Sequence, residues 1–428
     1  MCDGAAMNSD PSRFRLGINY WPSTTAMRWW QCFDMDEVER DFARIRGAGF
    51  DSVRIFLLWG IFQPTPDRVS EHALTRLERV ANAAHESDLS LLPTLFTGHM
   101  SGVNWLPRWA VDRESRLDSS SPAARFRIVV DNQVIRGTAK NWFSDEVVGD
   151  AQERLAGAAA EALRGHPALW AWDLGNENSN CCVPPTRRAG LAWLERMSTR
   201  IRVADPKVPI TLGLHMEDLM EDRRLGPREA SRFCDFLCMH GYPIYADFAE
   251  GPTDARILPF LGLVTRWLGG RDVLFAEFGA PAFPAEGLDS DRAQSSAPTI
   301  PLLEGENAAA FTRCAVEMLH AFGFLGAMLW CYADYGEALW SGPPLDEAAH
   351  ERWFGLWGAD GSPKPAVDEI HRFQGLPRAP QRRDLAWIDV DPDEFYTLPR
   401  QHLSRLYRRF CDRFGQDGVS CQVSIRED

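Results

Sequence analysis

The sequence lacks the apolar segments that direct a chain to or across a membrane. Residues 1–15 contain no basic stretch followed by an apolar run, so a secretory signal peptide is not expected. The most membrane-like stretch, the uncharged Leu319–Ala333, is shorter than the roughly 20 residues that cross a bilayer. The sequence therefore predicts no membrane partner.

The chain of 428 residues also lacks an excess of basic charge. It has 46 Lys and Arg against 60 Asp and Glu, a net charge of −14, and no cluster of basic residues. Nucleic-acid binding depends on such clusters, so a nucleic-acid partner is not expected. Ten cysteines without a disulfide-like spacing, in a chain with no signal peptide, indicate reduced thiols and a cytoplasmic location. The adjacent Cys181 and Cys182 are expected to be two free thiols.

Eight short apolar runs alternate with amphipathic segments, which is the pattern of βα units around a parallel sheet. Most runs are almost continuously apolar, as strands buried on both faces are. Side chains that can cap helices, Asp34, Ser70 and Ser144, precede three of the amphipathic segments. The alternation predicts a (β/α)8 TIM barrel. The eight runs are Arg15–Tyr20, Asp51–Leu58, Leu89–Thr97, Leu169–Leu174, Pro209–Leu214, Phe236–His240, Val273–Glu277 and Gly326–Trp330.

The predicted domain organisation is an N-terminal tail (1–14), a catalytic barrel (15–375), and a linker with a C-terminal extension (376–428). A bare barrel takes roughly 250 residues, so the surplus lies in loops. The longest loops follow strands and precede helices, and such loops project from the C-terminal face, where active sites lie. They are Gly98–Asn141, Gly279–Leu303 and Cys331–Gly361. A helix predicted over Pro399–Phe414 has an apolar face that would pack on the barrel or on a second copy of the chain, forming a homo-oligomer.

Two glutamates stand at the ends of predicted strands, Glu177 after the fourth and Glu277 in the seventh. Three βα units separate them, so they would face each other across the barrel mouth. A spacing of ~5–5.5 Å suits double displacement at the anomeric carbon of a sugar, with one carboxylate ionised and the other protonated. Taken singly, a glutamate at a strand end is more often a helix cap or a surface charge.

Neighbouring polar residues strengthen this interpretation. Arg54 lies inside an apolar strand and needs a buried anionic partner, for which Glu277 is the obvious candidate. Asn176 directly precedes Glu177 and can reach a sugar 2-hydroxyl.

Three more side chains leave the sixth and eighth strands. His240 and Tyr242 leave the sixth together, and a tyrosine hydroxyl can hold an ionised nucleophile. Trp330 ends the eighth strand, where an indole face could floor a sugar subsite.

In this order and at these strand ends, the residues resemble glycoside hydrolase clan A, and specifically family 5, the cellulase and mannanase family, over roughly Phe14–Phe373. The resemblance implies a retaining mechanism that needs no cofactor or metal, because carboxylates supply both proton transfer and the nucleophile. It implies Glu177 as acid/base, Glu277 as nucleophile, Asn176 as 2-hydroxyl ligand, Arg54 and Tyr242 as supports of the nucleophile, His240 as support of the acid/base, Trp330 as stacking platform, and His99 as the histidine often found after the third strand.

The segments Asn19–Pro22, Met27–Trp30 and Thr97–Trp105 look most like β-mannosidase-type members that act on short oligosaccharides. Three long loops on the catalytic face favour a pocket and exo-action on a terminal β-linked sugar, with a β-mannoside as the best candidate. An endo-β-1,4-mannanase or β-glucanase with the same machinery is the alternative, followed by a carbohydrate-binding barrel without catalysis. The chain has sixteen tryptophans, and those considered for sugar contact, although a single tryptophan more often serves packing, are Trp21, Trp30, Trp105, Trp142 and Trp340.

Overall fold

The structure is a computed structural model, and it describes residues 12–114, 125–283 and 300–415. Most of the predicted N-terminal tail and most of the predicted loop Gly279–Leu303 lie outside the described residues. Within the described ranges, no helix is both long and apolar enough to cross a membrane.

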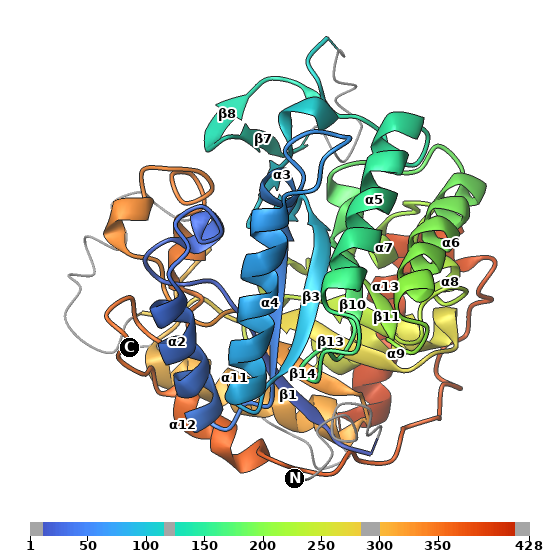
Figure 1. Ribbon diagram of the computed structural model, residues 1–428. Coiled ribbons are helices and arrows are strands. Elements are labelled where there is room, and N and C mark those ends of the chain that lie inside the picture. Colours follow the sequence, from blue (N-terminus) through green and yellow to red (C-terminus); the bar gives the residue numbers. More distant parts are fainter. Residues whose placement is uncertain (1–11, 115–124, 284–299, 416–428) are drawn as a thin grey trace.

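Eight parallel strands form the core of the molecule, in the spatial order β11-β10-β3-β2-β1-β14-β13-β12 (Figure 1). A parallel bridge between His215 and His240 joins β11 to β12 and closes the barrel. Every residue of the eight strands is buried, which explains why they are almost continuously apolar in sequence. The predicted (β/α)8 barrel is therefore confirmed. The strands are β1 (Arg15–Asn19), β2 (Ser52–Leu58), β3 (Ser90–Thr97), β10 (Trp172–Asn176), β11 (Ile210–Gly213), β12 (Leu237–His240), β13 (Val273–Phe278) and β14 (Gly326–Leu329).

Helices surround the barrel, and side-chain caps fix where several of them begin. Asp34 accepts hydrogen bonds from the backbone N–H groups of the first turn of α2, and Ser70 does the same for α4. The cap of α5 is Asp145, which accepts from the N–H of Val148, and not Ser144 as predicted. The longer helices are α2 (Met35–Gly47), α4 (Glu71–Glu86), α5 (Glu146–Ala162), α6 (Arg187–Ala204), α9 (Ile257–Gly269) and α11 (Gly305–Ala321), with a short α12 (Ala366–Ile370).

The loop after β3 builds most of the added structure on the catalytic face. It contains a small sheet in which β4 (His99–Met100), β5 (Val103–Trp105), β7 (Arg127–Val130) and β8 (Gln133–Ile135) lie side by side. The β7–β8 hairpin rises above the barrel in Figure 1. Ion pairs connect this loop to the loop after β14, through Arg127 and Asp346, and to the segment after β11, through Arg125 and Glu221.

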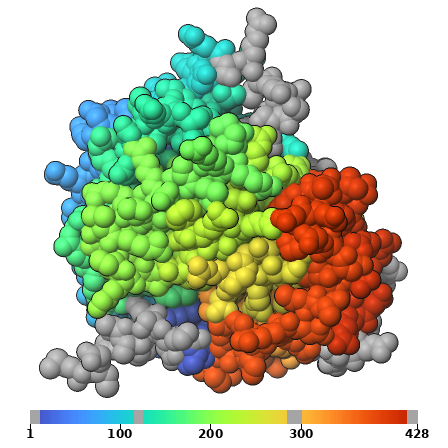
Figure 2. Space-filling view, turned by 90° about the vertical axis from the view of Figure 1, so that its right-hand side faces the viewer, coloured from blue at the N-terminus to red at the C-terminus, as the bar shows by residue number. Residues whose placement is uncertain are grey.

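The C-terminal helix α13 (Pro399–Phe414) packs on the barrel. It buries Leu403, Leu406, Tyr407 and Phe410, the apolar face predicted from the sequence. The ring of Tyr407 lies 5.1 Å from that of Phe260 in α9, and Figure 2 shows the C-terminal segment (red) against the flank of the barrel. This helix therefore covers part of the barrel wall, and a homo-oligomer through it stays a prediction.

Candidate active site

A cavity of about 380 Å³ opens at the carboxyl ends of the barrel strands. Two of the predicted tryptophans, Trp21 and Trp105, do not line it. Eight of the ten site residues predicted from the sequence either line this cavity or contact a residue that does. Those in its wall are His99, Asn176, Glu177, His240, Tyr242, Glu277 and Trp330, and Arg54 lies directly beneath them.

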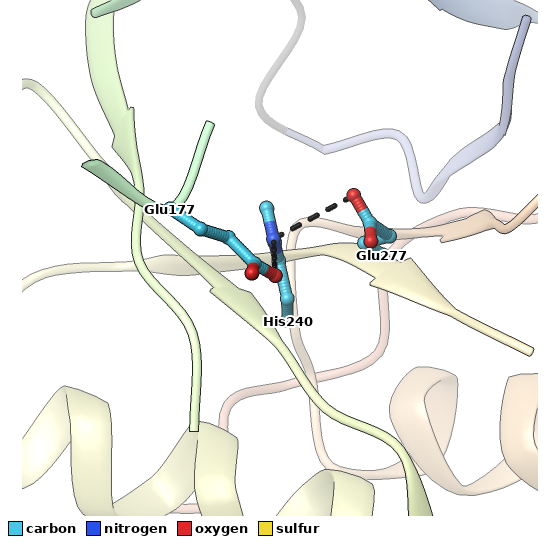
Figure 3. Close-up of side chains that lie close together, drawn as sticks. All are labelled: Glu177, His240 and Glu277. Atoms are coloured by element: carbon cyan, nitrogen blue, oxygen red, sulfur yellow. Dashed lines mark hydrogen bonds and ion pairs between the residues drawn. The ribbon is translucent and has the colours of Figure 1, made fainter. Parts of the chain in front are cut away.

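Glu177 and Glu277 face each other across this cavity, with His240 between them (Figure 3). One oxygen of each carboxyl and one nitrogen of His240 all lie within 4.8 Å of one another. Glu177 follows β10 directly and has a φ of 48°, in the left-handed region that non-glycine residues seldom adopt. Such backbone strain is concentrated at functional sites. The spacing and burial of the two carboxyls allow one reacting carbon atom to lie between them.

Glu277 receives two strong hydrogen bonds. The guanidinium of Arg54 donates to Oε2 at 3.0 Å, and the hydroxyl of Tyr242 donates to Oε1 at 2.7 Å. Arg54 is completely buried, and this contact supplies the anionic partner that its place in an apolar strand requires. Both carboxyl oxygens of Glu277 are thus fixed by hydrogen bonds from Arg54 and Tyr242.

Arg54 has a second acidic partner that was not foreseen from the sequence. Asp173 in β10 accepts from Arg54 at 2.7 Å, and it also accepts from the hydroxyl of Thr94 at 2.8 Å. Another N–H of Arg54 donates to the side-chain oxygen of Asn176 at 2.8 Å. Arg54 therefore connects the strand carrying Glu277 to the strand that leads into Glu177.

The surroundings of Glu177 contain mostly neutral groups. Nδ1 of His240 lies 3.1 Å from Oε1, and the side-chain amide of Asn180 donates to Oε2 at 3.0 Å. His99 and His215 approach Oε2 more loosely, at 3.8 and 3.6 Å. Burial lowers the pKa of His240 to about 4 and lowers the pKa values of His99 and His215 as well, so the three imidazoles are neutral at pH 7.

The two carboxyls differ in how well they tolerate a negative charge. Burial raises the pKa of Glu177 and of Glu277 above the ordinary value. Glu277 has a directly bonded cation and a hydroxyl donor that stabilise its ionised form, whereas Glu177 is hydrogen-bonded only to neutral groups. A single proton shared between them will therefore reside on Glu177.

Trp330 lines the cavity, but the other tryptophans considered as sugar contacts do not. Trp21 is completely buried and stacks on Phe56 with the ring centroids 4.9 Å apart, and Trp105 is 5% exposed within the small sheet. Their large apolar rings fill the space between the loops and the barrel, where burial contributes most to stability. Trp30, Trp142 and Trp340 also pack against other aromatic side chains, and none of them lines the cavity.

Several cavity residues were not foreseen from the sequence. They come from irregular loops, where no periodicity marks a side chain as inward-facing. Tyr245 follows β12, and Glu351 belongs to the loop after β14. Further examples are Ser101, Arg125, Phe126, His215, Glu217, Arg223 and His350.

Glu177, His240 and Glu277 are also close enough together to hold a metal ion. However, both oxygens of Glu277 already accept hydrogen bonds from Arg54 and Tyr242, and a guanidinium at 3.0 Å would repel a second cation. The hydrogen-bond donors around Glu277 therefore suit a reactive carboxylate better than they suit a metal ligand.

No protein-family model matches the chain, and no curated protein matches it significantly in sequence. Several solved structures match the chain in fold. A GH5_18 enzyme from Streptomyces cattleya, crystallised with GlcNAc, superimposes with a TM-score of 0.73 at 23% identity, covering 95% of this chain and 92% of its own. The exo-beta-1,4-mannosidase Op5Man5 from Opitutaceae bacterium strain TAV5 gives a TM-score of 0.65 at 25% identity, over 84% of this chain and 59% of its own. A GH5_18 variant from Bifidobacterium longum, in complex with Manb1-4GlcNAc, gives 0.67 at 20% identity, over 86% and 80%. The chain thus has the fold of the GH5_18 enzymes, which confirms the resemblance to glycoside hydrolase family 5 found in its sequence.

Proposed function

We propose that the protein is a retaining exo-β-glycosidase that releases a terminal β-linked sugar, best a β-mannoside, from short oligosaccharides. The observation that carries the proposal is the pair of buried carboxyls, Glu177 and Glu277, whose nearest oxygens lie within 4.8 Å. Such proximity suits direct attack by one carboxylate on the anomeric carbon, because an inverting enzyme needs a wider gap to admit water.

In the first step, Glu277 attacks the anomeric carbon while Glu177 gives its proton to the glycosidic oxygen. A carbon–oxygen bond to Glu277 forms as the bond to the leaving sugar breaks. In the second step, the now ionised Glu177 takes a proton from water, the water oxygen attacks the same carbon, and Glu277 leaves. Two inversions give net retention.

The neighbouring residues support these two roles. Arg54 and Tyr242 keep Glu277 ionised and fix the direction of its attack. His240 contacts both carboxyls, at 3.1 and 3.6 Å, and orients them toward each other. Asn176 and Trp330 also line the cavity, and we assign Asn176 to the sugar 2-hydroxyl and Trp330 to the platform beneath the ring that is cleaved.

Two sets of ion pairs support exo-action. Arg127 in the loop after β3 pairs with Asp346 in the loop after β14 at 2.7 and 2.8 Å. Arg125, from the same loop, pairs with Glu221 after β11 at 3.0 Å. Cross-links on both sides of the mouth favour a closed pocket, which accepts a chain end, over an open groove, which accepts the middle of a polymer.

The sugar is inferred from the relatives. One similar structure is named an exo-beta-1,4-mannosidase, and another holds Manb1-4GlcNAc. The same inference makes a short oligosaccharide the expected substrate here. The cytoplasmic location stays a prediction from the sequence.

The test is a screen of aryl β-glycosides with purified protein, comparing mannoside with glucoside, galactoside and fucoside. The proposal predicts that kcat/KM is highest for the mannoside. Incubation with β-mannan then separates exo- from endo-action: steady release of mixed short oligosaccharides would contradict the pocket. A protein that cleaves none of the glycosides would contradict the function itself.

A further inference from the structure

The carboxyl of Glu177 is held by a chain of side chains that begins outside the barrel. The first link is Asn180, which lies in the turn after β10, three residues after Glu177. Its amide nitrogen donates to Oε2 of Glu177 at 3.0 Å, and its amide oxygen accepts from Arg223 at 2.7 Å.

Arg223 determines which way the amide of Asn180 points. A guanidinium has only donors, so the oxygen of Asn180 must face Arg223 and the NH2 group must face Glu177. Because Oε2 of Glu177 accepts this N–H, its proton belongs on Oε1. Oε1 lies 3.1 Å from Nδ1 of His240, and the same nitrogen lies 3.6 Å from Oε2 of Glu277, so Oε1 is the oxygen on the side of the second carboxyl (Figure 3).

Arg223 is itself held on its far side by two acids. It is 2% exposed, and its guanidinium pairs with Glu217 and Glu221, each at 3.2 Å. A buried cation requires such partners, and two carboxylates that bind different N–H groups fix the plane of the guanidinium.

The two acids are shared with the C-terminal extension. Arg400 in α13 pairs with Glu221 at 3.1 Å and with Glu217 at 3.4 Å. The hydroxyl of Tyr396, just before α13, donates to the backbone oxygen of Asp218 at 3.0 Å, between the two acids in sequence. The extension therefore touches the segment that holds Arg223 through both side chain and backbone.

We infer that the C-terminal helix α13 takes part in positioning the acid/base Glu177, through Arg223 and Asn180. The inference rests on the proposed function. It assigns a role to Arg400, which does not line the cavity, and to Arg223 and Asn180, which line it beside Glu177. Arg223, Asn180 and Arg400 are positioning residues, because each acts through Glu177.

The experiment compares two substrates of one sugar, the 2,4-dinitrophenyl β-glycoside and the β-linked disaccharide. The dinitrophenolate leaves without a proton, whereas the leaving sugar of the disaccharide needs one from Glu177. Arg223→Met should lower kcat/KM for the disaccharide by ~100-fold, toward the low end of what general acid catalysis contributes, and change the dinitrophenyl value by less than about threefold.

Two further variants locate the effect. Arg400→Met removes an exposed ion pair, so the same selective loss should reach only about fivefold. Arg405→Met is the matched control, since Arg405 lies in the same helix but pairs with Asp389, away from the cavity, and both substrates should be unaffected. If Arg223→Met fails to fold, Asn180→Ala removes the donor to Glu177 and should give the same selective loss.

Equal losses on both substrates in Arg223→Met or Asn180→Ala, with the wild type active on both, would overturn this inference and leave the proposed function intact. A wild type that cleaves neither substrate would contradict the proposed function and the inference with it.

Discussion

Arg54 offers the sharpest test of how this site is built, because it is completely buried and holds two acids at once. Arg54→Met keeps an apolar side chain of similar length and removes the cation. Glu277 and Asp173 then lose partners at 3.0 and 2.7 Å. Removing one partner from a buried ion pair costs ~3–5 kcal/mol, and we expect the free energy of unfolding at pH 7 to fall by about that amount.

This loss should depend on pH in a definite direction. In the wild type, burial raises the pKa of Glu277, and Arg54 opposes that rise. Without Arg54 the folded-state pKa of Glu277 moves further above the unfolded value, so the folded variant binds a proton more readily than the unfolded chain does. Stability of the variant therefore recovers as the pH falls, and the gap to the wild type narrows between pH 7 and pH 5.

Urea unfolding followed by tryptophan fluorescence measures both quantities. Arg405→Met serves as the control, because Arg405 and its partner Asp389 are 40% and 35% exposed, and exposed pairs contribute ~0–1 kcal/mol. A loss below 1 kcal/mol for Arg54→Met, or a gap that widens as the pH falls, would refute the reasoning.

The remaining predictions concern the other site residues. Glu177→Ala should lower kcat/KM for an oligosaccharide by ~10²–10⁴-fold and largely spare a dinitrophenyl glycoside; equal losses would assign the acid elsewhere. Tyr242→Phe removes a hydrogen-bond donor that lowers the pKa of Glu277. The acidic limb of the pH profile of kcat/KM, which reports protonation of the nucleophile, should therefore move to higher pH. An acidic limb that does not move would exclude this role of Tyr242. Trp330→Ala should raise KM in steady-state kinetics, because this ring lines the cavity. Trp21→Ala should leave KM unchanged and lower the free energy of unfolding in urea by ~3–5 kcal/mol, because this ring is buried against Phe56.

The barrel was predictable because strands buried on both faces are continuously apolar and alternate with amphipathic helices. Boundaries were less predictable. The fourth run was predicted as Leu169–Leu174, but β10 spans Trp172–Asn176, and Leu169 makes only an isolated bridge to β3. Ala168 and Trp170 already hydrogen-bond to Leu91 of β3, and Trp172 is where the pairing with β11 begins, a point for which the sequence contains no signal.

The strand-end residues of the site were predictable because the fold alone determines where a strand ends. Glu277 lies near the end of β13, and its contact with Arg54 inside β2 follows from the unfavourable burial of a single charge. Loop residues such as Arg223 and Glu351 were not predictable, since their positions depend on contacts between distant segments of the chain. Trp21 was assigned to sugar contact from its place near a strand end, but its ring turns toward Phe56 instead.

The central claim is that two closely spaced carboxyls cleave a β-glycoside by double displacement. Proton NMR of the first-formed sugar, recorded before mutarotation, tests it most directly. Direct attack by Glu277 predicts that the released sugar initially has the β configuration. An α product formed first would mean that water, and not Glu277, attacks the anomeric carbon, and would contradict the account.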